Sequence, residues 1–283
     1  MGFGALGQYL FNCMLKEPSL FDVVFVYNRT VEKVTSHPGM QPSQVLQDLS
    51  HFPSCGEVDL IIEVCHPAIT AQYGAAFLAA ASVFLGSPTA LADAPLEAAL
   101  RAASAAAGPG HGLYVPSGAL WGAADLAKMG AAGSLCSLRV TMKKHPASLQ
   151  LEGGAPKALL EAAIASSAQG ETVLYSGPVR ELARVAPNNV NTMAAAALAA
   201  ENLGFDGVTA VLISDPSLLA HIVVVEAEGR PASDGQCFSC RTVRVNPAPP
   251  GAVTGAATFA SFYASLKLAA ASCAGRGPGL HLV

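Results

Sequence analysis

The chain has 283 residues, of which 52% are hydrophobic and 13% charged, and its formal net charge is −4. This composition excludes a disordered chain. It also disfavours a nucleic-acid or anionic-membrane partner, because no excess of basic side chains is present to neutralise phosphates. Residues 64–92 carry no charged side chain, but Pro67, Gly74, Gly86 and Pro88 interrupt them, so we expect no transmembrane span.

Seven cysteines are scattered along the chain. Their odd number and irregular spacing fit reduced thiols better than a disulfide framework, so we expect a cytoplasmic protein. Cys237 and Cys240 form a lone CxxC with no second pair. We interpret them as two ordinary thiols and predict no metal site.

The first part of the chain alternates between strand-like and helix-like segments. A GxGxxG pattern at Gly2, Gly4 and Gly7 opens a helical segment that Pro18 ends. Further on, the pattern predicts strands over 22–27, 58–64, 83–85 and 113–115 and helices over 68–81 and 95–107. This alternation favours a parallel sheet with helical crossovers, a Rossmann-type α/β arrangement.

After about residue 117 the pattern changes to longer strands with irregular connections. Strands are predicted over 135–142, 172–175, 221–226 and 238–245, and a strong helix over 191–200. These segments favour an antiparallel or mixed sheet in a second, α+β domain. Residues 246–251 form a stiff linker, and the helix over about 252–270 is expected to return to the first domain. We therefore predict a dinucleotide-binding domain over 1–117 joined by 252–283, and a catalytic and dimerisation domain over 118–251.

The glycines Gly2, Gly4 and Gly7 lie where a dinucleotide fingerprint would cradle a pyrophosphate on the backbone N–H groups of a helix start. The acidic residue expected at the end of the next strand is absent. Asn28 and Arg29 follow Tyr27 there instead. Asn28 can hydrogen-bond a ribose hydroxyl, and Arg29 can pair with a 2′-phosphate, so we expect NADP to be used at least as readily as NAD.

The strand that should precede this glycine loop is not encoded, because Gly2 directly follows Met1. In a doubly wound sheet that strand is central and covered on both faces. We therefore expect the chain to be an incomplete or alternative start of a longer dehydrogenase, with low stability and weak dinucleotide binding.

Five motifs in this order resemble the L-aspartate dehydrogenase family, and within it the aspartate dehydrogenase domain-containing proteins of animals. They are Gly2–Gly7, the run Gly86–Asp93, the run Pro116–Gly122, the run Pro187–Ala195 and the run Ser214–His221. The resemblance implies a Rossmann domain followed by an α+β catalytic domain. It also implies NAD(P)-dependent oxidation of L-aspartate to iminoaspartate, which can feed NAD biosynthesis or hydrolyse to oxaloacetate and ammonia.

The resemblance also implies roles for single residues. Ala119 and Asn191 match cofactor-contacting positions, and His221 matches the catalytic histidine. Lys143 and Lys144, clustered at a strand end, are our candidates for binding the two substrate carboxylates, although a solvated charge pair is an equally good interpretation of them. His66 follows a strand end as well, where it is more typical of a loop residue than of a functional one.

Two other classes of function remain open from the sequence. One is a dinucleotide-binding sensor that does no chemistry, which the missing first strand favours. The other is a related oxidoreductase, such as a homoserine dehydrogenase or a dihydrodipicolinate reductase. In each enzymatic interpretation we expect a homodimer that acts on a small molecule.

Overall fold

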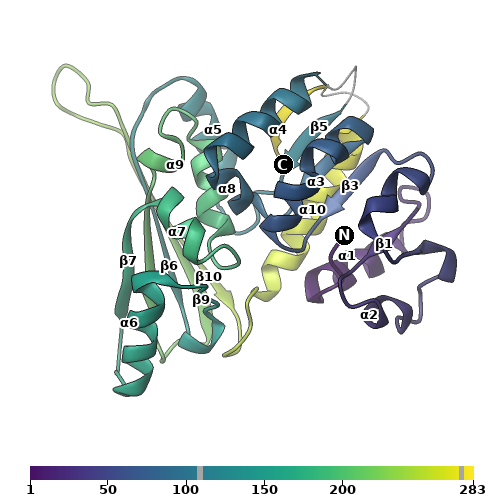
Figure 1. The fold of residues 1–283 in the computed structure, drawn as a ribbon. Coiled ribbons are helices and arrows are strands. Elements are labelled where there is room, and N and C mark those ends of the chain that lie inside the picture. The colour runs from purple at the N-terminus through teal and green to yellow at the C-terminus, as the bar shows by residue number, and fades with distance from the viewer. Residues whose placement is uncertain (107–110, 274–276) are drawn as a thin grey trace.

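The computed structural model describes residues 1–106, 111–273 and 277–283, and its strands form two larger sheets (Figure 1). One sheet is parallel and has four strands in the order β11-β5-β4-β3. These strands are β3 (Leu60–Glu63), β4 (Ser82–Leu85), β5 (Gly112–Val115) and β11 (Gly279–Leu282). The α/β class predicted from the sequence is confirmed.

Side chains alternate between the two faces of this parallel sheet, and each face packs on its own helices. Val83 and Leu85 lie in a core with Phe77 of α3 (Pro67–Ala80) and Leu100 of α4 (Ala94–Ala106). The intervening Phe84 belongs to a second core with α1 (Ala5–Met14) and α10 (Ala256–Cys273). The sheet is therefore covered by helices on both faces, as a doubly wound fold requires.

The C-terminal segment returns to the parallel sheet. Helix α10 packs on α1, and β11 adds a parallel strand beside β5 (Figure 1). We propose that residues 1–117 and 252–283 form one domain and residues 118–251 a second.

The second sheet has five strands in the order β10-β9-β6-β8-β7. It is mixed, because β6 and β8 are parallel while the other neighbours are antiparallel. Its strands are β6 (Leu135–Lys144), β7 (Thr172–Pro178), β8 (Thr209–Ser214), β9 (Ala220–Gly229) and β10 (Ser239–Pro247). The remaining helices of this part are α5 (Ala123–Ala131), α6 (Gly154–Ala165), α7 (Val179–Val185), α8 (Asn191–Ala199) and α9 (Gly204–Gly207).

Helix α8 is almost completely buried and belongs to the same core as Val83 and Leu85. Every residue from Thr192 to Ala199 is buried, and five of these eight are alanines. Small side chains let the helix approach its neighbours closely, and α8 makes contacts with α5, α7 and α9. The first residue of this buried helix, Asn191, is therefore held in a fixed position.

The prediction of a strand over 22–27 is largely wrong. Only β1 (Val26–Tyr27) is a strand, paired with β2 (Val45–Leu46) in a small separate sheet beside the short helix α2 (Glu32–Thr35). Residues 22–25 have no strand assignment. A strand needs a neighbour for its backbone groups, and here a cavity of about 700 Å³ lies between residues 22–26 and β3.

Residues 1 and 2 cross the end of that cavity. The Met1 α-ammonium donates to the Ile62 carbonyl (2.6 Å), Val64 N–H donates to the Met1 carbonyl, and Gly2 N–H donates to the Tyr27 carbonyl. They thus link β3 to β1. Burial lowers the pKa of the Met1 ammonium.

Three strands were not predicted: β2, β8 and β11. The helices predicted over 68–81 and 191–200 are confirmed to within two residues. The end of the helix predicted over 95–107 lies outside the described residues. Among the described helices, none is both long and apolar enough to cross a membrane.

Candidate active site

A cavity of about 390 Å³ lies between the two sheets. The parallel sheet contributes residues that follow the carboxyl ends of β3, β4 and β5, the edge at which open α/β sheets bind ligands. The mixed sheet contributes Met142, Lys144, His221, Val223 and Arg244. Residues from opposite ends of the chain therefore meet in one site.

The glycine loop at the start of α1 fits a dinucleotide pyrophosphate. A Cβ on Gly7 would lie 2.0 Å from the Gly2 carbonyl oxygen, so only glycine fits there, and Gly2 has a φ of +84°. Gly4 caps α1 without any side-chain hydrogen bond, and a Cβ there would meet nothing within 4 Å. No side chain caps the first-turn N–H groups of α1, which leaves them for another acceptor and suits an anion.

Asn28 supports this loop from the next strand. Its Oδ1 accepts from the Phe3 N–H (3.0 Å), and its Nδ2 donates to the Thr30 carbonyl (2.9 Å). The predicted ribose-binding side chain therefore already holds the glycine loop in place. Arg29 is exposed beside it, and none of the salt bridges among the described residues involves Arg29.

A buried carboxyl group fixes the loops that follow β3 and β4. Glu63 Oε1 accepts from Cys65 N–H (2.7 Å) and from the Ser87 hydroxyl, and its Oε2 accepts from Ser87 N–H (3.0 Å). Burial raises the pKa of Glu63, and the hydrogen bonds from Cys65 and Ser87 oppose that shift. This group shapes the edge of the site and does not line the cavity.

The loop after β5 brings backbone into the cavity at Ser117, Gly118 and Ala119. Gly118 has a φ of +59°, and its carbonyl accepts from Arg244 Nη1 (3.0 Å) and from the Ser261 hydroxyl (2.8 Å). The loop is therefore held from both parts of the molecule. Ala119, predicted to meet the cofactor, lies on the cavity wall.

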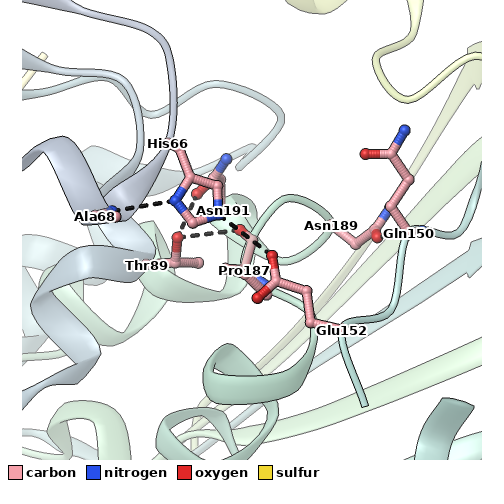
Figure 2. Close-up of polar contacts among 8 residues, drawn as sticks. All are labelled: His66, Ala68, Thr89, Gln150, Glu152, Pro187, Asn189 and Asn191. Carbon is pink, nitrogen blue, oxygen red and sulfur yellow. Dashed lines mark hydrogen bonds and ion pairs between the residues drawn. The ribbon is translucent and has the colours of Figure 1, made fainter.

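Asn191, the other predicted cofactor contact, begins α8 and also lines the cavity. The Thr89 hydroxyl lies 3.1 Å from Asn191 Oδ1 and 3.0 Å from the Pro187 carbonyl oxygen (Figure 2). Because Thr89 follows β4, this contact joins the parallel sheet to the start of α8.

A second contact of this kind involves His66, at the start of α3. Its Nδ1 accepts from Ala68 N–H, and its Nε2 lies 3.3 Å from Glu152 Oε1 (Figure 2). Both side chains of this contact are 46% exposed, so it contributes little stability. It lies beside the cavity, and His66 is one of the lining residues.

His221, on β9, is 7% exposed, and its Nε2 has no hydrogen-bond partner in the described part of the chain. Burial lowers the pKa of His221 to about 4, the nearby charge of Lys144 adds to this shift, and a hydrogen bond with the Ala252 backbone opposes it. The ring is therefore neutral at pH 7. A buried, unpartnered ring nitrogen in a cavity is a candidate proton acceptor.

The two predicted lysines point in opposite directions, because neighbouring residues of a strand face opposite sides of the sheet. Lys144 lines the cavity, is 3% exposed, and donates weakly to the Asn189 and Val253 carbonyls. Burial lowers its pKa to about 8. Lys143 instead pairs with Glu171 and does not line the cavity. The structure thus brings only Lys144 of the pair beside His221.

The sequence patterns did not identify several polar residues that line the cavity, among them Gln150, Asn189, Arg244 and Asn246. Asn189 holds the wall together, because its Oδ1 accepts from Gln150 N–H (2.7 Å; both residues are drawn in Figure 2) and its Nδ2 donates to the Ser148 carbonyl. Asn189 lies inside the motif Pro187–Ala195, so the sequence contained a signal for it. Arg244 carried no such signal.

The fold and site together define a class of protein. A glycine loop at a helix start, a doubly wound parallel sheet and a second sheet that closes the carboxyl edge are the architecture of a nicotinamide-dependent dehydrogenase. Sequence comparison agrees with it. Residues 2–116 match the family model for the NAD-binding domain of homoserine dehydrogenase, and residues 125–266 match the model for the C-terminal part of aspartate dehydrogenase.

The chain belongs to the aspartate dehydrogenase family. It is 47% identical to an aspartate dehydrogenase domain-containing protein of Xenopus tropicalis, over 100% of this chain and 96% of that protein. It is 30% identical to an L-aspartate dehydrogenase of Pseudomonas aeruginosa, over 81% of this chain and 82% of the relative. Among solved structures, aspartate dehydrogenase from Thermotoga maritima superposes with a TM-score of 0.64 at 18% identity, covering 94% of this chain and 91% of that one. This last similarity shows a shared fold.

Proposed function

We propose that this protein oxidises L-aspartate to iminoaspartate with NAD or NADP as the hydride acceptor. The observation that carries the proposal is that His221 and Lys144 line one cavity together with the loop after β5 and the start of α8. The names of the relatives support the choice of aspartate as substrate.

The residues present fit a nicotinamide cofactor, which supplies the acceptor for the hydride that leaves the substrate Cα. The glycine loop would hold the pyrophosphate, and the Ser117–Ala119 backbone and Asn191 would flank the ring. His221 Nε2, unprotonated at pH 7, accepts a proton from the substrate amine before the hydride leaves. Lys144 holds one carboxylate by charge and so orients the Cα–H bond.

Several finer expectations belong to this proposal. Arg29 is free to pair with a 2′-phosphate, so NADP should be used at least as readily as NAD. The iminoaspartate would hydrolyse to oxaloacetate and ammonia or feed NAD biosynthesis in the cytoplasm. A homodimer is supported by apolar side chains on the outer side of the mixed sheet, where Val173, Val243 and Val245 are each more than half exposed.

The direct test is to mix purified protein with L-aspartate and either NAD or NADP and to follow the absorbance of the reduced nicotinamide. We expect reduction that depends on L-aspartate. L-homoserine and L-alanine serve as competing substrates. Cofactor binding without reduction would instead support a sensor, and preferred turnover of L-homoserine would support the related oxidoreductase.

A further inference from the structure

Strand β10 faces the cavity with its polar side chains. Arg244 and Asn246 line the cavity. Val243 and Val245, which alternate with them along the strand, are 51% and 60% exposed. A half-buried strand ordinarily turns its apolar side chains inward. In β10 this orientation is reversed, so the Arg244 guanidinium lies in the cavity and two valines stay exposed. The lost apolar burial indicates that Arg244 has a function in the site.

The cavity has cationic side chains and no acidic ones among its described lining residues. Lys144 and Arg244 are its lysine and arginine, and burial alone lowers the pKa of each. Within the described chain, Arg244 donates through Nη1 to the Gly118 carbonyl (3.0 Å) and has no salt bridge. A guanidinium has five N–H donors, so most of them stay available to a ligand. A buried lysine and a partly buried arginine, with no carboxylate among the described residues that line the cavity, suit an anionic ligand.

The register of the mixed sheet places these cations on either side of the catalytic histidine. Val223 on β9 is opposite Met142 of β6 and opposite Arg244 of β10, while His221 is opposite Asn246. Strands β6 and β10 both flank β9, so they lie about 10 Å apart. Lys144 therefore reaches the cavity from one side of His221, and Arg244 from the other side.

We propose that Arg244 binds the second carboxylate of the substrate, so that Lys144 and Arg244 together select a small dicarboxylate. This inference rests on the function proposed above. A bidentate guanidinium–carboxylate contact would fix the orientation of the substrate as well as its charge. Arg244 would then tie substrate binding to the loop that presents Gly118, since the same side chain contacts both.

The test compares succinate with butyrate, which has the same carbon chain and one carboxylate fewer, by calorimetric titration of the NADP-loaded protein. Arg244→Gln should weaken succinate binding about 10- to 100-fold and leave butyrate nearly unchanged, so that the two ligands become similar. Arg244→Lys should recover part of the difference. Arg241→Gln is the matched control, because Arg241 lies on the same strand, is exposed and pairs with Glu226. It should behave as the wild-type protein does.

Equal affinities for succinate in the wild type and Arg244→Gln would overturn the inference, as would a wild type that fails to prefer succinate over butyrate. A loss of NADP affinity equal to the loss of succinate affinity would overturn it too, because Arg244 would then serve the Gly118 loop alone. Turnover separates the two proposals. If L-aspartate is not oxidised but the succinate preference still depends on Arg244, the proposed function fails and the dicarboxylate site stands.

Discussion

The cavity between the sheets and the cavity beside β3 differ in how their walls are held. The site between the sheets is lined by polar groups whose neighbours fix them, such as Gly118, whose carbonyl accepts from Arg244 and Ser261, and Asn189, which bonds to Gln150 and Ser148. The cavity beside β3 is lined largely by apolar side chains, including Leu10, Phe11 and Ile62, and residues 22–25 beside it have no strand assignment.

This difference predicts that changes in one cavity affect ligand binding, whereas changes in the other affect the stability of the fold. Side chains in the first cavity converge from several elements, so single substitutions there should change ligand binding or turnover while the fold persists. The side chains that line the second cavity are largely apolar, so filling it should mainly change the free energy of unfolding. The predictions below test that division, from the largest expected effect to the smallest.

The largest effect is expected from His221. His221→Ala and His221→Gln should lower kcat for L-aspartate by about 10²- to 10⁴-fold, because the amine proton loses its acceptor. Cofactor affinity and melting temperature should change little. His51→Ala is the control, since His51 is exposed and does not line the cavity. Near-normal turnover in a folded His221 variant would remove His221 from the chemistry.

The second prediction concerns the apolar cavity. Placing about five to seven Val- and Ile-rich residues before Gly2 should fill it with a strand beside β3. Burial of about five apolar side chains gives roughly 7–15 kcal/mol, and ordering the added residues at about 1.5 kcal/mol each consumes most of that gain. The net gain of a few kcal/mol should raise the melting temperature by on the order of 10 °C. A Gly/Ser addition of equal length is the control. Equal melting temperatures would show that another segment fills this space.

Arg29 tests the cofactor end of the site. Arg29→Ala should weaken NADP binding by roughly 1–3 kcal/mol, the magnitude of a charge-assisted contact, and leave NAD binding unchanged. Direct titration with both cofactors measures this. Equal weakening of NAD and NADP would mean that Arg29 supports the loop and does not read the 2′-phosphate.

The smallest effect is expected from Lys144, as a dependence of succinate affinity on pH. Because burial lowers its pKa to about 8, Lys144 is a cation below pH 8 and loses its charge above it. Succinate affinity should therefore fall by up to tenfold per pH unit above about pH 8, and Lys144→Arg should flatten the profile. Lys143→Gln, on the opposite side of the same strand, should leave the profile as it is. A profile that is unchanged in Lys144→Arg would contradict this role.

The same lysine has a defined effect on stability. Its pKa is about 8 in the folded protein against 10.5 ordinarily, so the folded protein binds fewer protons than the unfolded chain between these values. Its contribution to the free energy of unfolding should therefore rise between pH 8 and 10.5. Urea titrations of the wild type and Lys144→Met across this range measure that contribution, and equal slopes in the two proteins would contradict it.

Local patterns in the sequence were enough to predict the alternating strands and helices of the parallel sheet and the buried helix that begins at Asn191. They could not predict that residues 22–25 would have no strand assignment, because strand pairing depends on a neighbour elsewhere in the chain. Arg244 was missed for a related reason. The alternation of polar and apolar residues on β10 suggests that the valines face inward, and only the register with β9 shows that Arg244 and Asn246 do.

The pair Lys143 and Lys144 makes the same point within the site. A sequence shows that two cations are adjacent, but neighbouring residues of a strand face opposite sides of the sheet, and tertiary packing decides which side is the cavity. His221 and Asn191 could be found because whole motifs carried them. The partners that orient them, Thr89 and the Ala252 backbone, lie far away in the sequence.

The most direct test of the central claim is to follow the hydrogen on the substrate Cα. L-Aspartate carrying deuterium at Cα is incubated with the protein and NADP, and the reduced cofactor is analysed by mass spectrometry. We predict that one deuterium appears in the reduced nicotinamide with the wild-type protein and that His221→Ala forms this product at least about 100-fold more slowly. Absence of deuterium in the cofactor would contradict the assignment of this cavity as the active site of an aspartate dehydrogenase.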